Sequence, residues 1–143
     1  MLHTLVHVLP GLVGLVIAAG VVLWLGSRDQ KTTMIAVLVC WLAATAGQVL
    51  TGRIIAPIIG GDAVFALWLI WFAWSRPAWW VWSLFAVEAL RLMLHASEIG
   101  LQLPLPYAPL NNTLSLSVLA VLALAAVLHA RQGRVAEAPA AAE

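Results

Sequence analysis

Long apolar segments separated by short polar or proline-rich connections dominate the chain. Because about 20 apolar residues in an α-helix cross the hydrocarbon core of a bilayer, each long segment predicts a transmembrane helix. Four segments reach that length, at about 4–25, 32–52, 77–102 and 111–130. Asn111 or Asn112 is the expected N-cap of the last of them, after a proline-rich connection.

A fifth apolar segment, 54–75, is interrupted near its start. Pro57, Gly60 and Gly61 lie there, and all three residues disfavour a helix interior. We therefore expect the helix to begin at Asp62 as its N-cap and to run to residue 75. Its length alone also fits an interfacial or re-entrant segment.

The distribution of basic residues decides whether this fifth segment crosses the membrane. Arg28 and Lys31 follow the first helix, and Arg131 and Arg134 follow the last. The positive-inside rule places both pairs in the cytoplasm, so an even number of crossings must separate them. The total is then five, with the N-terminus outside, the C-terminus inside, and Arg76 also inside.

The composition agrees with a membrane protein. Hydrophobic residues make up 64% and charged residues 9% of the 143 positions, whereas soluble domains carry about 25% charged residues. We expect an all-α fold, a compact five-helix transmembrane bundle forming one domain over 1–134, with a disordered cytoplasmic tail at 135–143. The first segment has no basic n-region or cleavage site and is expected to stay as a helix. The Ala/Leu/Val-rich composition, without an organelle presequence, favours a bacterial inner membrane, and the net charge of +1 argues against nucleic-acid partners.

A ladder of polar residues on the 77–102 segment is the strongest functional signal. It comprises Glu88, Arg91, His95, Glu98 and Gln102, at successive spacings of three and four. At roughly 100° per residue these side chains fall within an arc of about 80° on one helical face. Charge in the bilayer is costly, so this face is expected to contact protein or water and is a functional-site hypothesis.

The five-span topology places the far end of this ladder in the outer half of the membrane, together with polar residues of other helices. The predicted intramembrane polar cluster comprises Glu88, Arg91, His95, Glu98, Gln102, Gln48, Asn111 and Ser115. Glu88 and Arg91 are three residues apart and can form an ion pair. That pair has two interpretations, a device that fixes helix packing or part of a proton pathway.

A second hypothesis concerns metal or haem. His3, His7, His95 and Glu98 have side chains that bind transition metals, and two histidines four apart share a helical face. Asp62 offers a further oxygen ligand. The chain has no HExxH motif, and its single cysteine is Cys40, so no ligand motif supports the set.

No hydrolase, P-loop or dinucleotide motif is present, so we identify no catalytic residue and favour a non-enzymatic role. The first hypothesis is an accessory or self-assembling membrane component whose polar outer-half site takes a partner helix or a small ligand. The chain is small for a stand-alone transporter and has no inverted repeat, which favours a homo-oligomer or a subunit of a larger complex. The alternatives are a metal- or haem-binding redox component and an oligomeric, holin-like pore or proton-conducting protein.

Overall fold

The computed structural model describes residues 2–52, 55–101 and 106–137, and these residues form helices joined by short connections, with no strand among them. The elements are α1 (Leu2–Leu25), α2 (Arg28–Thr51), α3 (Ile55–Ser75), α4 (Trp79–Ala96), a π-helical segment η1 (Ser97–Leu101) and α5 (Tyr107–Glu137). The all-helical prediction is confirmed. Three helices are long and apolar enough to cross a membrane: α2, α3 from Ala56, and α5 as far as Gly133.

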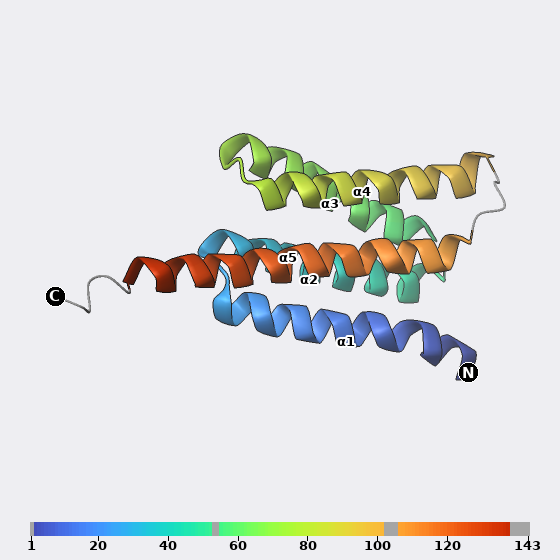
Figure 1. Ribbon diagram of the computed structural model, residues 1–143. Coiled ribbons are helices and arrows are strands. Elements are labelled where there is room, and N and C mark those ends of the chain that lie inside the picture. The colour runs from blue at the N-terminus through green and yellow to red at the C-terminus, as the bar shows by residue number, and fades with distance from the viewer. Residues whose placement is uncertain (1, 53–54, 102–105, 138–143) are drawn as a thin grey trace.

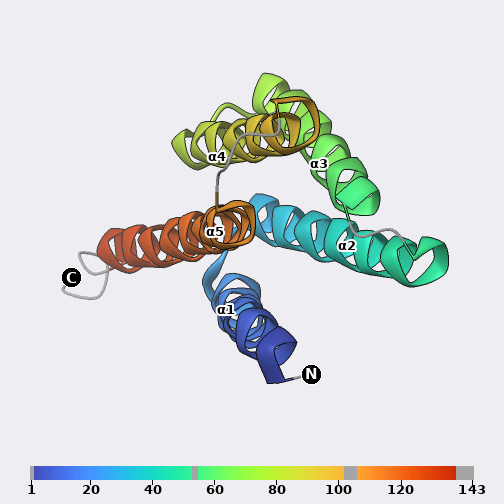
Figure 2. The same ribbon diagram turned by 90° about the vertical axis from the view of Figure 1, so that its right-hand side faces the viewer.

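Successive helices run in alternating directions, so the N- and C-termini lie at opposite ends of the molecule (Figure 1). Helix α5 packs between α1 and α4, and α3 packs between α4 and α2 (Figure 2). Helices α1 and α2 also contact each other, so the five helices form a closed arrangement. The α1–α2 and α3–α4 connections lie at the same end as the C-terminus.

We call that end the basic end, because it carries Arg28, Lys31, Arg76 and Arg131. An exposed ion pair between Arg76 and Asp29 joins the α3–α4 connection to the first turn of α2 there. A capping box begins α2: the Ser27 hydroxyl accepts from the Gln30 amide, and the Gln30 side chain accepts from the Ser27 amide. This cap explains why α2 starts at Arg28, before the predicted residue 32.

The outer surface of the molecule is largely apolar. Only 11% of the most apolar stretch of α2 is buried, and Ile35, Val39 and Leu42 are all exposed on it. Trp24 and Trp74 are 85% and 90% exposed and lie near the basic end. Apolar surface on this scale is costly in water. The three long apolar helices therefore indicate a membrane location.

Helix α3 begins at Ile55, which makes the predicted start at 62 wrong. Pro57 is the third residue of the helix, where the missing N–H would have no intrahelical acceptor. Gly61 permits close packing on α2, since a Cβ there would lie 3.3 Å from the Cys40 carbonyl oxygen and 3.4 Å from the Ala44 Cβ. Asp62 is therefore an interior residue of α3, not its N-cap.

The last two helices also differ from their predicted bounds. The expected single helix over 77–102 is α4 followed by the π-helical η1, and α4 starts after Ala78, whose backbone is extended. Helix α5 starts at Tyr107, so Asn111 lies in its second turn and is not an N-cap. It extends to Glu137, three residues into the predicted tail, and residues 138–143 lie outside the described ranges.

Candidate functional site

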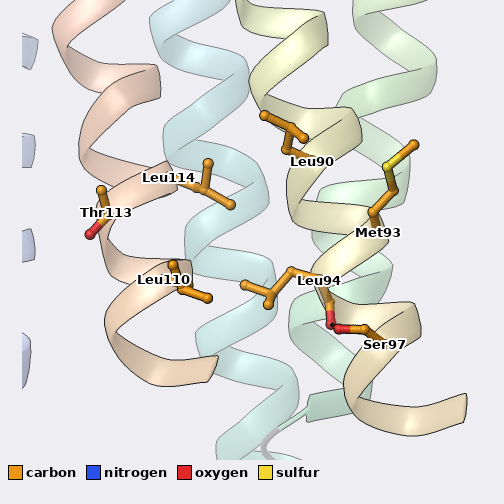
Figure 3. A pocket seen from close by; sticks show the side chains of 7 residues that line it. All are labelled: Leu90, Met93, Leu94, Ser97, Leu110, Thr113 and Leu114. Carbon is orange, nitrogen blue, oxygen red and sulfur yellow. Dashed lines mark hydrogen bonds between the residues drawn. The ribbon is translucent and has the colours of Figure 1, made fainter. Parts of the chain in front are cut away.

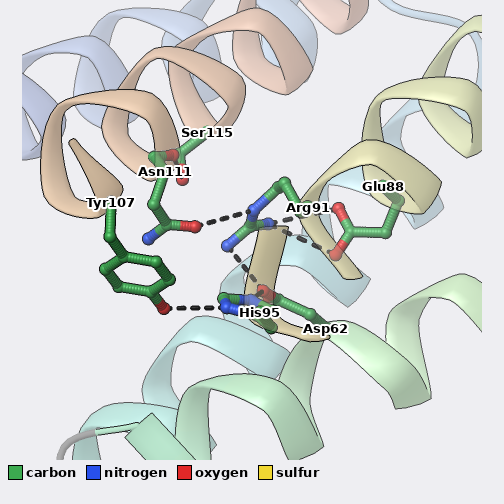
Figure 4. Close-up of polar contacts among 7 residues, drawn as sticks. All are labelled: Asp62, Glu88, Arg91, His95, Tyr107, Asn111 and Ser115. Atoms are coloured by element: carbon green, nitrogen blue, oxygen red, sulfur yellow. Dashed lines mark hydrogen bonds and ion pairs between the residues drawn. The ribbon is translucent and has the colours of Figure 1, made fainter. Parts of the chain in front are cut away.

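Asp62 of α3 and two residues of α4 meet inside the bundle (Figure 4). The Asp62 Oδ2 atom lies 2.9 Å from Nη2 of Arg91 and 2.7 Å from Nε2 of His95. Both Asp62 and His95 are buried, with His95 only 2% exposed. One carboxylate oxygen thus joins a guanidinium and an imidazole from the neighbouring helix.

Arg91 is the centre of this group. Its Nη1 donates to both carboxylate oxygens of Glu88, at 3.3 Å and 3.1 Å, and its Nε donates to Oδ1 of Asn111 at 3.4 Å. Glu88 is completely buried. The planar guanidinium therefore holds groups from α3, α4 and α5 at once, which suits its fixed fork of donors.

The second ring nitrogen of His95 is also engaged. Its Nδ1 lies 2.7 Å from the hydroxyl of Tyr107, the first residue of α5. Tyr107 is half-buried, and its ring lies tilted beside the imidazole. We call the connected set of Asp62, Glu88, Arg91, His95, Tyr107 and Asn111 the polar network.

The charges of the polar network do not balance without an added proton. It holds two carboxylates, Asp62 and Glu88, against one guanidinium, Arg91. With both carboxylates ionised and His95 neutral, the network has one excess negative charge, and protonation of His95 makes it neutral. An excess charge in a low-dielectric interior is costly, so one bound proton stabilises the network. Among the described residues, every buried side-chain nitrogen and oxygen has a hydrogen-bond partner.

The polar network lies in the half of the bundle opposite the basic end. Towards the basic end, the core of these three helices is apolar, and its completely buried members include Leu84 on α4, Leu69 on α3 and Leu122 on α5. Glu88 is the network member nearest this apolar layer along α4. The charged part of the interior therefore ends at Glu88 in this direction. The buried polar side chains nearer the basic end, Gln30 and Thr33, bond to the backbone at the start of α2.

The structure brings four residues of the predicted polar cluster into the network: Glu88, Arg91, His95 and Asn111. The Ser115 hydroxyl donates to the Asn111 backbone carbonyl and not to another side chain.

Two other members of the predicted polar cluster are not joined to the polar network, and a third lies outside the described residues. Gln48 on α2 and Glu98 on η1 are half-buried, and neither makes a hydrogen bond to the polar network within the described ranges. The π-helical turn shifts the rotation of Glu98 relative to His95, so the ladder does not continue regularly. Gln102 lies outside the described residues.

The two described members of the predicted metal set, His95 and Glu98, lie in different surroundings. Both ring nitrogens of His95 already have protein partners. Glu98 lies within the π-helical segment η1, beyond the end of α4. The side chains of His3 and His7 lie outside the described part of α1. Within the described residues, no group of three or more His, Cys, Asp or Glu side chains is placed to hold a metal ion.

Two network residues were absent from the predicted polar cluster. The sequence predicts Asp62 as a helix cap and a candidate ligand, and it predicts a connection where Tyr107 lies. A signal existed for each: Asp62 is the only acidic residue in segment 54–75, and Tyr107 is the only tyrosine in the chain. Their roles depend on α3 and α5 starting earlier than predicted.

An apolar groove of about 360 Å³ runs between α4 and α5 beside the polar network (Figure 3). Its lining comprises Leu90, Met93, Leu94, Ser97, Leu110, Thr113 and Leu114. The Ser97 and Thr113 hydroxyls donate to backbone carbonyls of their own helical turns. The groove is therefore separate from the network, whose residues do not line it.

No protein family, curated protein or solved structure matches this chain.

Proposed function

We propose that this protein crosses a bacterial inner membrane five times, with its N-terminus outside and its C-terminus inside. The alternating helix directions and the opposite positions of the termini support an odd number of crossings. The basic end gathers Arg28, Lys31, Arg76 and Arg131, which the positive-inside rule assigns to the cytoplasm. The polar network then lies in the outer half of the membrane.

We infer further that the polar network is a one-sided proton-binding site. One observation carries this proposal: two buried carboxylates face one guanidinium and one imidazole in a continuous line of contacts. A proton on His95 balances the charges of the network. The protein would act as an accessory membrane component whose outer half binds and releases a proton.

This role is favoured over two others. A partner helix is not needed to satisfy the network, because α3, α4 and α5 of the same chain already supply its contacts. A proton pore would need a polar path through the inner half, where Leu69, Leu84 and Leu122 are completely buried. Proton binding from the outer side therefore fits the interior of the bundle better than proton conduction through it.

The test is a nuclear magnetic resonance titration of the histidine ring nitrogens in lipid nanodiscs. The His95 signal is assigned by its loss in His95→Gln. We expect it to change from neutral imidazole to imidazolium as the pH falls in the wild type. In Asp62→Asn, the negative charge of Glu88 and the positive charge of Arg91 already cancel. We therefore expect His95 to stay neutral over the same pH range. Asp29→Asn, at the opposite end, is the matched control and should leave the His95 titration unchanged.

Two results would reject the proposal. The first is a His95 titration that is absent, or that is the same in Asp62→Asn as in the wild type. The second is proton flux across liposomes containing the wild-type protein that Glu88→Gln abolishes, because this result identifies a conducting pore.

A further inference from the structure

The two hydrogen bonds of His95 decide which of its ring nitrogens carries a hydrogen. Oδ2 of Asp62 lies 2.9 Å from Nη2 of Arg91 and 2.7 Å from Nε2 of His95. An ionised carboxylate only accepts hydrogen bonds, and a guanidinium only donates them. Asp62 therefore accepts from both neighbours, and Nε2 of His95 carries the hydrogen that it donates to Asp62.

The other ring nitrogen of neutral His95, Nδ1, is then an acceptor. The Tyr107 hydroxyl lies 2.7 Å from Nδ1 and donates to it. Tyr107 is half-buried, whereas His95 and Asp62 are both buried. The nitrogen with a free lone pair therefore faces the more accessible of the two neighbours of the ring (Figure 4).

Other charged or titratable groups lie around the polar network without bonding to the imidazole. They are Arg91 and Glu88 of α4, Glu98 of η1 and the Cys40 thiol of α2. Within the described ranges, only Asp62 and Tyr107 make hydrogen bonds to the ring nitrogens of His95. The difference between the two nitrogens therefore depends on these two partners.

We infer that Nδ1 is the atom of His95 that takes up the proton, and that Tyr107 is the positioning residue for this step. The lone pair of Nδ1 bonds to a proton of a hydronium ion, whose O–H bond breaks and which leaves as water. The Tyr107 hydroxyl keeps its own hydrogen and turns about its C–O bond, so that its oxygen accepts from the new Nδ1–H group. Nε2 keeps its hydrogen and its bond to Asp62. Release follows the same steps in reverse.

This inference rests on the proposed proton-binding function and names the atom and the residue that control it. Tyr107 bonds to both forms of His95, as a donor to the neutral ring and as an acceptor from the imidazolium. The bond to the imidazolium is the stronger, because its donor is charged. Tyr107 therefore stabilises protonated His95 more than neutral His95, and it links the charge of the polar network to the first residue of α5.

The experiment is nitrogen-15 magnetic resonance of the histidine ring nitrogens in nanodiscs, which distinguishes a nitrogen with a hydrogen from one without. In the wild type at high pH, we expect a hydrogen on Nε2 of His95 and none on Nδ1. At low pH we expect a hydrogen on both.

Tyr107→Phe keeps the aromatic ring and removes only the hydroxyl. We expect the neutral form to keep its hydrogen on Nε2, because Asp62 is unchanged. The pH at which half of His95 is protonated should fall by about one unit, which corresponds to the difference between a charged and a neutral hydrogen bond. Ser97→Ala is the matched control and should titrate as the wild type, since it removes a nearby hydroxyl that bonds to the Leu94 carbonyl.

The outcomes separate this inference from the proposed function. If wild-type His95 does not titrate, the proposed function fails and the inference fails with it. If His95 titrates but its neutral form carries the hydrogen on Nδ1, only the inference is overturned. A Tyr107→Phe titration equal to that of the wild type, or to a shifted one in Ser97→Ala, overturns the role of Tyr107. Should Tyr107→Phe fail to fold, the wild-type spectra still decide which nitrogen takes up the proton.

Discussion

Arg91 is the residue on which the polar network depends most. Its guanidinium contacts Asp62, Glu88 and Asn111, which belong to three helices. A lysine has no planar fork and could not hold these oxygens in the same arrangement. Removing the guanidinium leaves two buried carboxylates facing each other without a fixed cation.

We therefore expect Arg91→Gln to lower the free energy of unfolding by about 3 kcal/mol or more, because the buried carboxylates of Asp62 and Glu88 lose their cation. Tryptophan fluorescence during denaturant-driven unfolding in detergent micelles measures the change. Arg76→Gln is the matched control, since it breaks the ion pair with Asp29 at an exposed site and should cost less than about 1 kcal/mol. Equal losses in the two variants would contradict a central role for Arg91.

Part of the network was predictable at the residue scale. The spacing of Glu88 and Arg91 on one helix predicted that they could form an ion pair, and the structure contains it at 3.1 Å. The contact between Asp62 and His95 spans 33 positions and depends on how α3 packs against α4. Local spacing carries no information about such a contact.

The first turns of α3 contain Pro57, Gly60 and Gly61, residue types with low intrinsic helix propensity. Pro57 occupies the first turn, where its missing N–H has no intrahelical acceptor. Gly61 faces α2 at close range, whereas Gly60 faces open space. The same residue type therefore has different effects at adjacent positions, because only one of them lies in a helix contact.

This difference predicts opposite results for two neighbouring substitutions. Gly61→Leu should destabilise the protein by about 1–3 kcal/mol, because its side chain would be forced against the Cys40 carbonyl and Ala44. Gly60→Leu should be neutral or stabilising by up to about 1 kcal/mol, since it replaces a flexible helical glycine in open space. Thermal unfolding of both variants in detergent checks this, and a larger loss for Gly60→Leu would show that α3 packs differently.

At the scale of the whole molecule, the interior changes character along the bundle axis. The basic end carries the loop arginines, the adjoining core is apolar, and the far half contains the polar network. The proposed orientation therefore places the basic end in the cytoplasm and the polar network in the outer half of the membrane.

Cysteine labelling in intact cells tests the proposed orientation. In a Cys40→Ala background, we expect Asn112→Cys to react with a membrane-impermeant maleimide from outside. Arg76→Cys should react only after the cells are permeabilised, because α4 separates the two positions. The reverse pattern would invert the topology, and labelling of both from one side would show that α4 does not cross the membrane.

The helical architecture was predictable without any structure, because apolar segment length and composition are local properties. The separation of basic from polar regions was likewise predictable, because the basic residues gather in alternate connections with Arg53 as the exception. The membership of the polar network, in contrast, follows from how the helices pack. Asp62 and Tyr107 join it through helix packing and earlier helix starts, while the π-helical turn separates Glu98 from the regular ladder. Contacts between helices depend on the rotation of each helix about its axis, and that rotation is set by side-chain packing across the whole bundle.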